Sequence, residues 1–266
     1  MKFEEEILKY FPCKIYNLLK KEIDEDTKKY IQEIRVRCNR PIILNLRNTD
    51  IIINYQINQC ELLEILEKIC NNSVYAYKNQ ICNGFITVKG GHRIGITGTA
   101  VIENNDVINL KYISGLNFRI AREVLNCSDK LIGNIIDKEN NTIYNTLIVS
   151  PPGKGKTTML RDIIRKVSNG IPELEFLGKN CGVVDERGEI AAMYKGIPQN
   201  DIGIRTDVIE NISKEKGMKM LIRSMAPDII ACDEIGSKED VDAIKEALLC
   251  GVKGIFTMHR KIFRRN

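Results

Sequence analysis

Hydrophobic positions in the second half of the chain alternate between two patterns. Short continuous apolar runs at residues 146–149, 182–185, 229–232 and 255–258 are typical of strands buried in a parallel sheet. Between the first two runs, Leu160, Ile163, Ile164 and Val167 recur at helical spacing, and Gly170 follows the last of them. Further helical patterns precede Pro227 and follow Ser237. This alternation of strands and helices predicts a parallel sheet with helices on both faces.

The first half has a mixed pattern. We expect helices over residues 3–20 and 62–69 and short strands at 41–46 and 51–55. Two β-type runs flank Lys89-Gly90-Gly91, which predicts a hairpin. A connector containing a short helix at 129–136 leads to a polar turn at 138–141. We therefore place a smaller mixed α/β domain at residues 1–137 and the parallel-sheet domain at residues 138–266.

Charge and cysteine content limit the possible functions. The net charge is +5, but four basic residues without an acid lie in the last seven positions, so the remainder is almost neutral. This distribution argues against a nucleic-acid partner. Nine cysteines without a C-x-x-C spacing, together with two histidines, argue against a zinc site and favour reduced thiols in a cytoplasmic protein. An acidic N-terminus and the lack of a long apolar run argue against a signal peptide and a transmembrane segment.

The loop between the first strand and its helix carries candidate phosphate-binding chemistry. Gly155-Lys156-Thr157 matches the end of the P-loop pattern, although Ser150 stands where its first glycine is usual. Gly153 and Gly155 allow backbone amides to approach phosphates, Lys156 can reach the β- and γ-phosphates, and the Thr157 hydroxyl can bind Mg²⁺. The predicted ATP-binding segment comprises Ser150, Pro152, Gly153, Lys154, Gly155, Lys156, Thr157 and Thr158.

Acidic and basic side chains follow three other predicted strands. Asp233 and Glu234 end an apolar run in the Walker B arrangement, in which Asp233 would hold the Mg²⁺ shell and Glu234 would orient the attacking water. Glu186 is a candidate second carboxylate for water or metal, and His259 is a candidate γ-phosphate sensor. Because the carboxyl ends of parallel strands meet at one edge of a sheet, we expect these groups near the P-loop. For Asp233 and Glu234 the alternative is an ordinary polar turn after the strand. For His259 the alternative is a surface histidine without a role in the site.

Collinear blocks along nearly the whole chain resemble the stage III sporulation protein AA family, a group of secretion-type ATPases related to type II and type IV secretion motors. The matching blocks are residues 33–37, 84–98, 114–123, the P-loop, 185–190, 203–208, 216–236 and 251–259. The resemblance implies a RecA-like P-loop ATPase domain behind an N-terminal domain, with nucleotide between them. It assigns Walker A to Lys156 and Thr157, Walker B to Asp233 and Glu234, and the acidic box to Glu186. The histidine box corresponds to Thr257-Met258-His259.

The resemblance also implies partners. Arg119 and Arg122 resemble arginines that contact phosphate from an N-terminal domain or a neighbouring subunit; a basic solvated strand edge is the alternative. A homo-oligomeric, hexameric ring would power a channel between mother cell and forespore, docking on small membrane proteins from the mother-cell side of the membrane. The residues after His259 depart from the family pattern, so we expect a shortened C-terminus that uncovers the strand at 255–258. A nucleic-acid-stimulated RecA-like ATPase and an ATP-binding scaffold without turnover remain alternatives.

Overall fold

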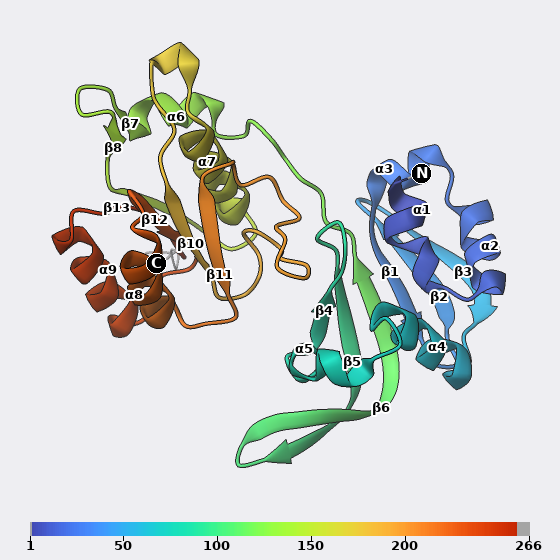
Figure 1. Ribbon diagram of the computed structural model, residues 1–266. Helices are drawn as coiled ribbons and strands as arrows, with labels where there is room; N and C mark the ends of the chain where they lie inside the picture. Colours follow the sequence, from blue (N-terminus) through green and yellow to red (C-terminus); the bar gives the residue numbers. More distant parts are fainter. Residues whose placement is uncertain (1, 260–266) are drawn as a thin grey trace, which may run out of the picture. The chain divides into compact units, whose positions relative to one another are not determined.

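The computed structural model describes residues 2–259, which divide into two compact units (Figure 1). The first unit is Met1–Arg122 and the second is Glu123–Asn266. The division therefore falls before residue 123 rather than near 138. The reason is that helix α6 (Asp129–Ile135) buries Ile132 and Ile135 in the hydrophobic core of the second unit. No helix within residues 2–259 is long and apolar enough to cross a membrane.

The described part of the first unit contains a six-stranded antiparallel sheet in the order β3-β2-β1-β6-β5-β4. The strands are β1 (Ile31–Arg37), β2 (Pro41–Leu46), β3 (Asp50–Gln56), β4 (Phe85–Thr87), β5 (Arg93–Glu103) and β6 (Asp106–Arg119). The helices are α1 (Lys2–Glu6), the 3-10 helix η1 (Leu8–Tyr10), α2 (Cys13–Glu22), α3 (Glu25–Tyr30), α4 (Gln59–Ile69), the 3-10 helix η2 (Val74–Tyr77) and α5 (Lys78–Cys82). The predicted hairpin at Lys89-Gly90-Gly91 is the β4–β5 pair.

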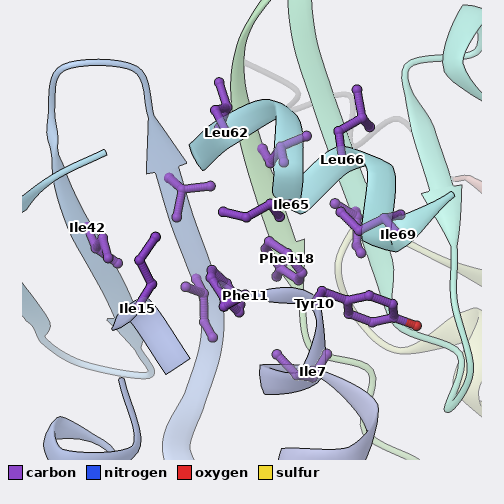
Figure 2. Close-up of a cluster of buried hydrophobic side chains, with 14 of the residues drawn as sticks. Ile7, Tyr10, Phe11, Ile15, Ile42, Leu62, Ile65, Leu66, Ile69 and Phe118 are labelled. Atoms are coloured by element: carbon purple, nitrogen blue, oxygen red, sulfur yellow. The ribbon is translucent and has the colours of Figure 1, made fainter. Parts of the chain in front are cut away.

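The helix expected over residues 3–20 is broken in the structure. It is divided into α1, η1 and α2, with Phe11 in an extended conformation before Pro12. Proline disfavours helical geometry at the residue before it and supplies no N–H of its own. The break places Phe11 against Phe118 of β6, with ring centroids 4.8 Å apart. Figure 2 shows this stacked pair within the core that α2 and α4 form against the sheet.

The second unit contains a parallel sheet, five-stranded within the described residues, in the order β11-β10-β12-β13-β9. Its strands are β9 (Thr146–Ser150), β10 (Cys181–Asp185), β11 (Thr206–Glu210), β12 (Ile229–Cys232) and β13 (Lys253–His259). Its longer helices are α7 (Lys156–Asn169), α8 (Lys214–Met225) and α9 (Lys238–Leu249). A small ribbon, β7 (Ile136–Asp137) with β8 (Thr142–Ile143), and the 3-10 helix η3 (Pro172–Leu174) complete the unit.

Helices cover both faces of this sheet, as the sequence predicted. Successive strand residues alternate between two cores, so Val183 packs in the cluster with α6 and α7 while Val184 packs in the cluster with α8 and α9. The helix boundaries follow local signals. A capping box of Ser237 and Asp240 opens α9, and Gly170 ends α7 with a φ of 88°.

The strand that precedes the P-loop lies at one edge of the described sheet. The sequence predicted a buried strand, but Leu147 and Val149 of β9 are 50% and 42% exposed. Conversely, β13, which was expected to be uncovered, lies between β12 and β9, and its Ile255 and Phe256 are buried. Within β9 and β13, the exposed apolar side chains are therefore Leu147, Val149 and Met258.

Asp162 on α7 anchors the segment that enters the second unit. Its buried carboxylate accepts hydrogen bonds from Asn126 N (3.0 Å), Ser128 N (2.8 Å) and Ser128 Oγ (2.6 Å), and pairs with Arg165 at 2.7 Å. Burial alone would raise the pKa of Asp162, but the hydrogen bonds from Ser128 and Arg165 outweigh it and lower the pKa to about 2. The ionised carboxylate is thus part of the folded structure.

Replacing this carboxylate should destabilise the second unit. Because its folded-state pKa lies below the unfolded value, its contribution is present above pH 4 and disappears as the pH falls toward 2. Asp162→Asn should lose ~2 kcal/mol of stability at neutral pH, and its deficit against the wild type should shrink in acid. Denaturant unfolding measured from pH 7 to pH 2.5 tests this. Asp129→Asn, which removes an exposed carboxylate beside Lys166, is the control; a deficit independent of pH would contradict the assignment.

Candidate functional site

The carboxyl ends of β9, β10, β12 and β13 place the candidate residues at one end of the parallel sheet. The P-loop joins β9 to α7, and its Gly153 and Gly155 have φ values of 70° and 80°. These are left-handed conformations that favour glycine. Gly155 is also the N-cap of α7, so the positive end of that helix and its free amides face the loop. This geometry suits an oxyanion such as phosphate.

Lys156 is buried, and its ammonium group has three acceptors. It donates to Ser150 O at 3.0 Å, to Pro151 O at 3.1 Å and to His259 Nδ1 at 2.8 Å. Only 6% of the Lys156 surface is exposed, so these bonds replace the water that a buried ammonium loses. Because the ammonium can only donate, Nδ1 of His259 must accept, and the proton of the neutral ring is on Nε2.

His259 connects Lys156 to the Walker B glutamate. Its Nε2 lies 2.7 Å from Oε1 of Glu234, which is the expected arrangement when Nε2–H donates to a carboxylate. The other oxygen of Glu234, Oε2, forms an ion pair with Arg187, which lies in the turn after β10. Both carboxylate oxygens of Glu234 therefore have a partner contributed by a neighbouring strand end.

A threonine on β13 organises the Walker B pair. Thr257 is fully buried, and its hydroxyl donates to Oδ1 of Asp233 and accepts from Glu234 N at 2.8 Å. The other oxygen of the Asp233 carboxylate, Oδ2, accepts a hydrogen bond from the Thr157 hydroxyl at 2.5 Å. Glu234 itself has a φ of 52°, a conformation that is uncommon for residues with a Cβ. The bond to Thr257 helps to hold this backbone.

The acidic residue that ends β10, Asp185, has a structural role. The buried Asp185 carboxylate accepts from the amides of Glu189, Ile190 and Ala191 at 2.8–3.1 Å and shapes the following loop. Glu186 forms an ion pair with Lys214 at the start of α8. On the adjacent strand, burial and then the negative charge of Asp185 raise the pKa of Glu210. Negative charge is therefore concentrated at this end of the sheet.

The acidic end of the sheet forms a small cavity lined by Asp185, Glu186, Arg187, Glu189, Lys214, Asp233 and Glu234. Within residues 2–259 there is no group of three or more His, Cys, Asp or Glu side chains arranged to bind a metal. The pair of Thr157 Oγ1 and Asp233 Oδ2 nevertheless fits Mg²⁺, which usually takes one or two protein oxygens together with phosphates and water. These residues could thus hold the ion with a nucleotide, rather than alone.

Comparison with known proteins identifies the family. The model of the family "Sporulation stage III, protein AA" matches residues 1–264. The stage III sporulation protein AA of Bacillus subtilis (strain 168) is 39% identical over 254 residues, which are 96% of this chain and 81% of that protein. This chain belongs to the sporulation stage III protein AA family.

Solved structures share the fold. The Legionella pneumophila ATPase DotB has a TM-score of 0.57 and 16% identity over 92% of this chain, which spans 66% of the DotB chain. The pilus retraction motor PilT, solved with bound ADP, has a TM-score of 0.56 and 14% identity over 98% of this chain and 72% of its own. At these identities the likeness shows the fold alone. It confirms the predicted RecA-like parallel sheet preceded by an N-terminal α/β unit.

The structure brings five predicted site residues into one network of contacts: Lys156, Thr157, Asp233, Glu234 and His259. The remaining P-loop residues, Ser150, Pro152, Gly153, Lys154, Gly155 and Thr158, lie at the end of β9, in the turn or at the start of α7. Glu186 lies at the same sheet end but is paired with Lys214.

The two predicted arginines belong to the first unit. Arg122 donates to the carbonyl oxygens of Lys28 and Ile31 at 2.9 and 2.8 Å, which joins α3 to the end of the sheet. Arg119 ends β6, and its largely exposed guanidinium lies 3.9 Å from Glu33. The sequence did not reveal these partners, because each lies more than eighty residues away from its arginine in the chain.

For three further residues of the site the sequence predicted no contacts: Thr257, Arg187 and Lys214. Thr257 lies two positions before His259 on β13, so both side chains are on the same side of that strand. That spacing was a usable signal for Thr257. Arg187 and Lys214 have no comparable signal, because the contacts of Arg187 with Glu234 and Lys214 with Glu186 depend on the order of strands in the sheet.

Removal of the Thr257 hydroxyl should weaken the Walker B end of the sheet. Thr257→Val keeps the shape but leaves Asp233 Oδ1 and Glu234 N without this partner, which should cost about 1–3 kcal/mol. Denaturant unfolding measures the loss. Thr146→Val, which removes an exposed hydroxyl bonded to Tyr144 O on β9, should cost clearly less. A Thr257→Val protein as stable as the wild type would refute the bridging role.

Proposed function

We propose that this chain is a MgATP-binding and ATP-hydrolysing motor of the secretion-ATPase type. The observation that carries the proposal is the convergence of the P-loop lysine, the P-loop threonine, the Walker B acids and His259 within hydrogen-bond distance. Family membership and the fold shared with DotB and PilT support it. The resemblance alone would not give this arrangement of side chains.

In the proposed binding mode, ATP phosphates contact the amides of the P-loop, residues 150–158, and the Lys156 ammonium. Lys156 is already directed by the loop carbonyls toward the strand ends, so a phosphate oxygen can replace one of its three acceptors. Thr157 and Asp233 would hold Mg²⁺, which supplies charge neutralisation for the β- and γ-phosphates when it is bound.

Hydrolysis is assigned to the carboxylate and imidazole groups at the same sheet end. Glu234 orients the attacking water, because its side chain adjoins Asp233 and contacts the histidine that also contacts Lys156. His259 senses the γ-phosphate through Lys156. Glu186 is a second carboxylate for water or metal, although its ion pair with Lys214 must first be broken.

Family membership supports a proposal for the wider role. We propose a homo-oligomeric, hexameric ring in which Arg119 contacts phosphate, since its guanidinium is exposed, whereas Arg122 would have to give up two backbone carbonyls. The ring would act in the cytoplasm of the mother cell at the membrane and dock on small membrane proteins. It would energise a channel between mother cell and forespore. Mass measurement with MgATP tests the ring.

Lys156→Ala should remove nucleotide binding. The ammonium is the buried positive charge at the loop, and its loss takes away the main attraction for the β- and γ-phosphates. Titration with a fluorescent ATP analogue should show at least a tenfold weaker affinity than the wild type. Lys154→Ala, at an exposed loop position, is the matched control and should change affinity much less. Equal affinities of Lys156→Ala and wild type would refute the P-loop assignment.

Glu234→Gln should separate binding from turnover. The amide cannot accept a proton from water, so phosphate release should fall by about 10²-fold or more, while MgATP affinity stays near the wild-type value. Normal turnover would exclude Glu234 as the water-orienting group. The same assay with DNA added distinguishes the alternatives: strong stimulation would favour a nucleic-acid motor, and binding without turnover would favour a scaffold.

A further inference from the structure

The carboxylate of Glu234 lies between two donor groups, one on β13 and one in the turn that follows β10. His259 Nε2 contacts Oε1 at 2.7 Å, and the Arg187 guanidinium pairs with Oε2. In the proposed reaction Glu234 must offer an oxygen to water. A carboxylate that shares its charge with a guanidinium and a ring N–H is a weaker acceptor for a third group. The observed arrangement therefore restrains the group that the reaction needs.

The same glutamate is connected to the P-loop lysine. Lys156 donates to His259 Nδ1, and this bond leaves the His259 Nε2–H directed at Glu234. A phosphate oxygen that binds Lys156 competes for the ammonium hydrogens. When Lys156 turns from Nδ1 toward phosphate, the imidazole loses the partner that orients it. The Lys156–His259–Glu234 chain thus gives phosphate a direct way to loosen one oxygen of Glu234.

Arg187 controls the other oxygen, and its pair with Glu234 is readily reversible. The Arg187 side chain is 64% exposed while that of Glu234 is 23% exposed. Ion pairs with one exposed partner contribute little and are screened by salt. The adjacent cation, Lys214, is buried and paired with Glu186, so it does not replace Arg187 at Glu234. A weak and exposed pair suits a restraint that must open once in each cycle.

We propose that Arg187 is a positioning residue that restrains one oxygen of the Glu234 carboxylate, Oε2, and that phosphate at Lys156 releases the other oxygen, Oε1, through His259. This inference rests on the proposed ATPase function and concerns the regulation of the same site. Arg187 does not contact the reacting atoms; it acts through Glu234. Because phosphate does not reach the Arg187 pair, this restraint lowers hydrolysis even when MgATP is bound, and any partner that draws Arg187 away from Glu234 raises the hydrolysis rate.

The test compares steady-state phosphate release at saturating MgATP in the full chain. Arg187→Ala should raise the basal rate about two- to fivefold, the effect expected when a weak exposed ion pair is lost, with unchanged affinity for a fluorescent ATP analogue. Arg187→Lys keeps the charge and should stay near the wild-type rate. Lys245→Ala removes an exposed ion pair with Asp242 away from the site and should have no effect.

Salt gives a readout that a merely structural role would not change. The ratio of the Arg187→Ala rate to the wild-type rate should fall toward one as KCl rises from about 50 to 500 mM, since screening removes the pair from the wild type. A lower rate in Arg187→Ala, or a ratio independent of salt, would overturn the restraint while leaving the ATPase proposal intact. Absence of nucleotide binding in the wild type would instead overturn the proposed function and this inference together.

Discussion

A buried ammonium group is the interaction on which the rest of the site depends. Lys156 is almost fully buried, and such a charge is tolerated only when acceptors replace its water. Two of the acceptors are carbonyls of its own loop, and the third is His259 on another strand. The lysine therefore ties the P-loop to β13. Through His259 this connection continues to the Glu234 carboxylate.

The strand order extends the Lys156–His259 contact into a network of hydrogen bonds. Because β13 lies between β9 and β12, its side chains can reach the P-loop on one side and the Walker B acids on the other. His259 contacts Lys156 of the P-loop, and Thr257 contacts Glu234 of the Walker B pair. The two residues are two positions apart on β13. Asp233 then closes the network by accepting from Thr157 at the start of α7. These contacts join the loop, the helix and two strand ends.

The fold was predictable where the signals are local. The apolar runs of β9, β10, β12 and β13, the capping box of α9 and the glycine that ends α7 are each contained within a few residues. Strands β1, β6 and β11 were missed because charged or polar residues interrupt their apolar positions. The break of the first helix at Pro12 was missed although proline signals it, because the apolar spacing continues through it.

The candidate site shows the same difference between residues with a local sequence signal and residues without one. Lys156, Thr157, Asp233 and Glu234 were predicted because their motifs place them next to a strand end. The contacts of Arg187 and Thr257 with the Walker B acids were not predicted, because they depend on the register of strands that lie far apart in sequence. The register of β13 against β9 pairs His259 with Ser150, and a shift by one residue would turn the imidazole to the other face of the sheet. Although β9 lies at the edge of the described sheet, with Leu147 half exposed, its alignment with β13 is thus what a functional P-loop requires. The Lys156–His259 bond spans the end of that register and can stabilise it, so the charge that would bind phosphate also helps to align the strand that carries the loop.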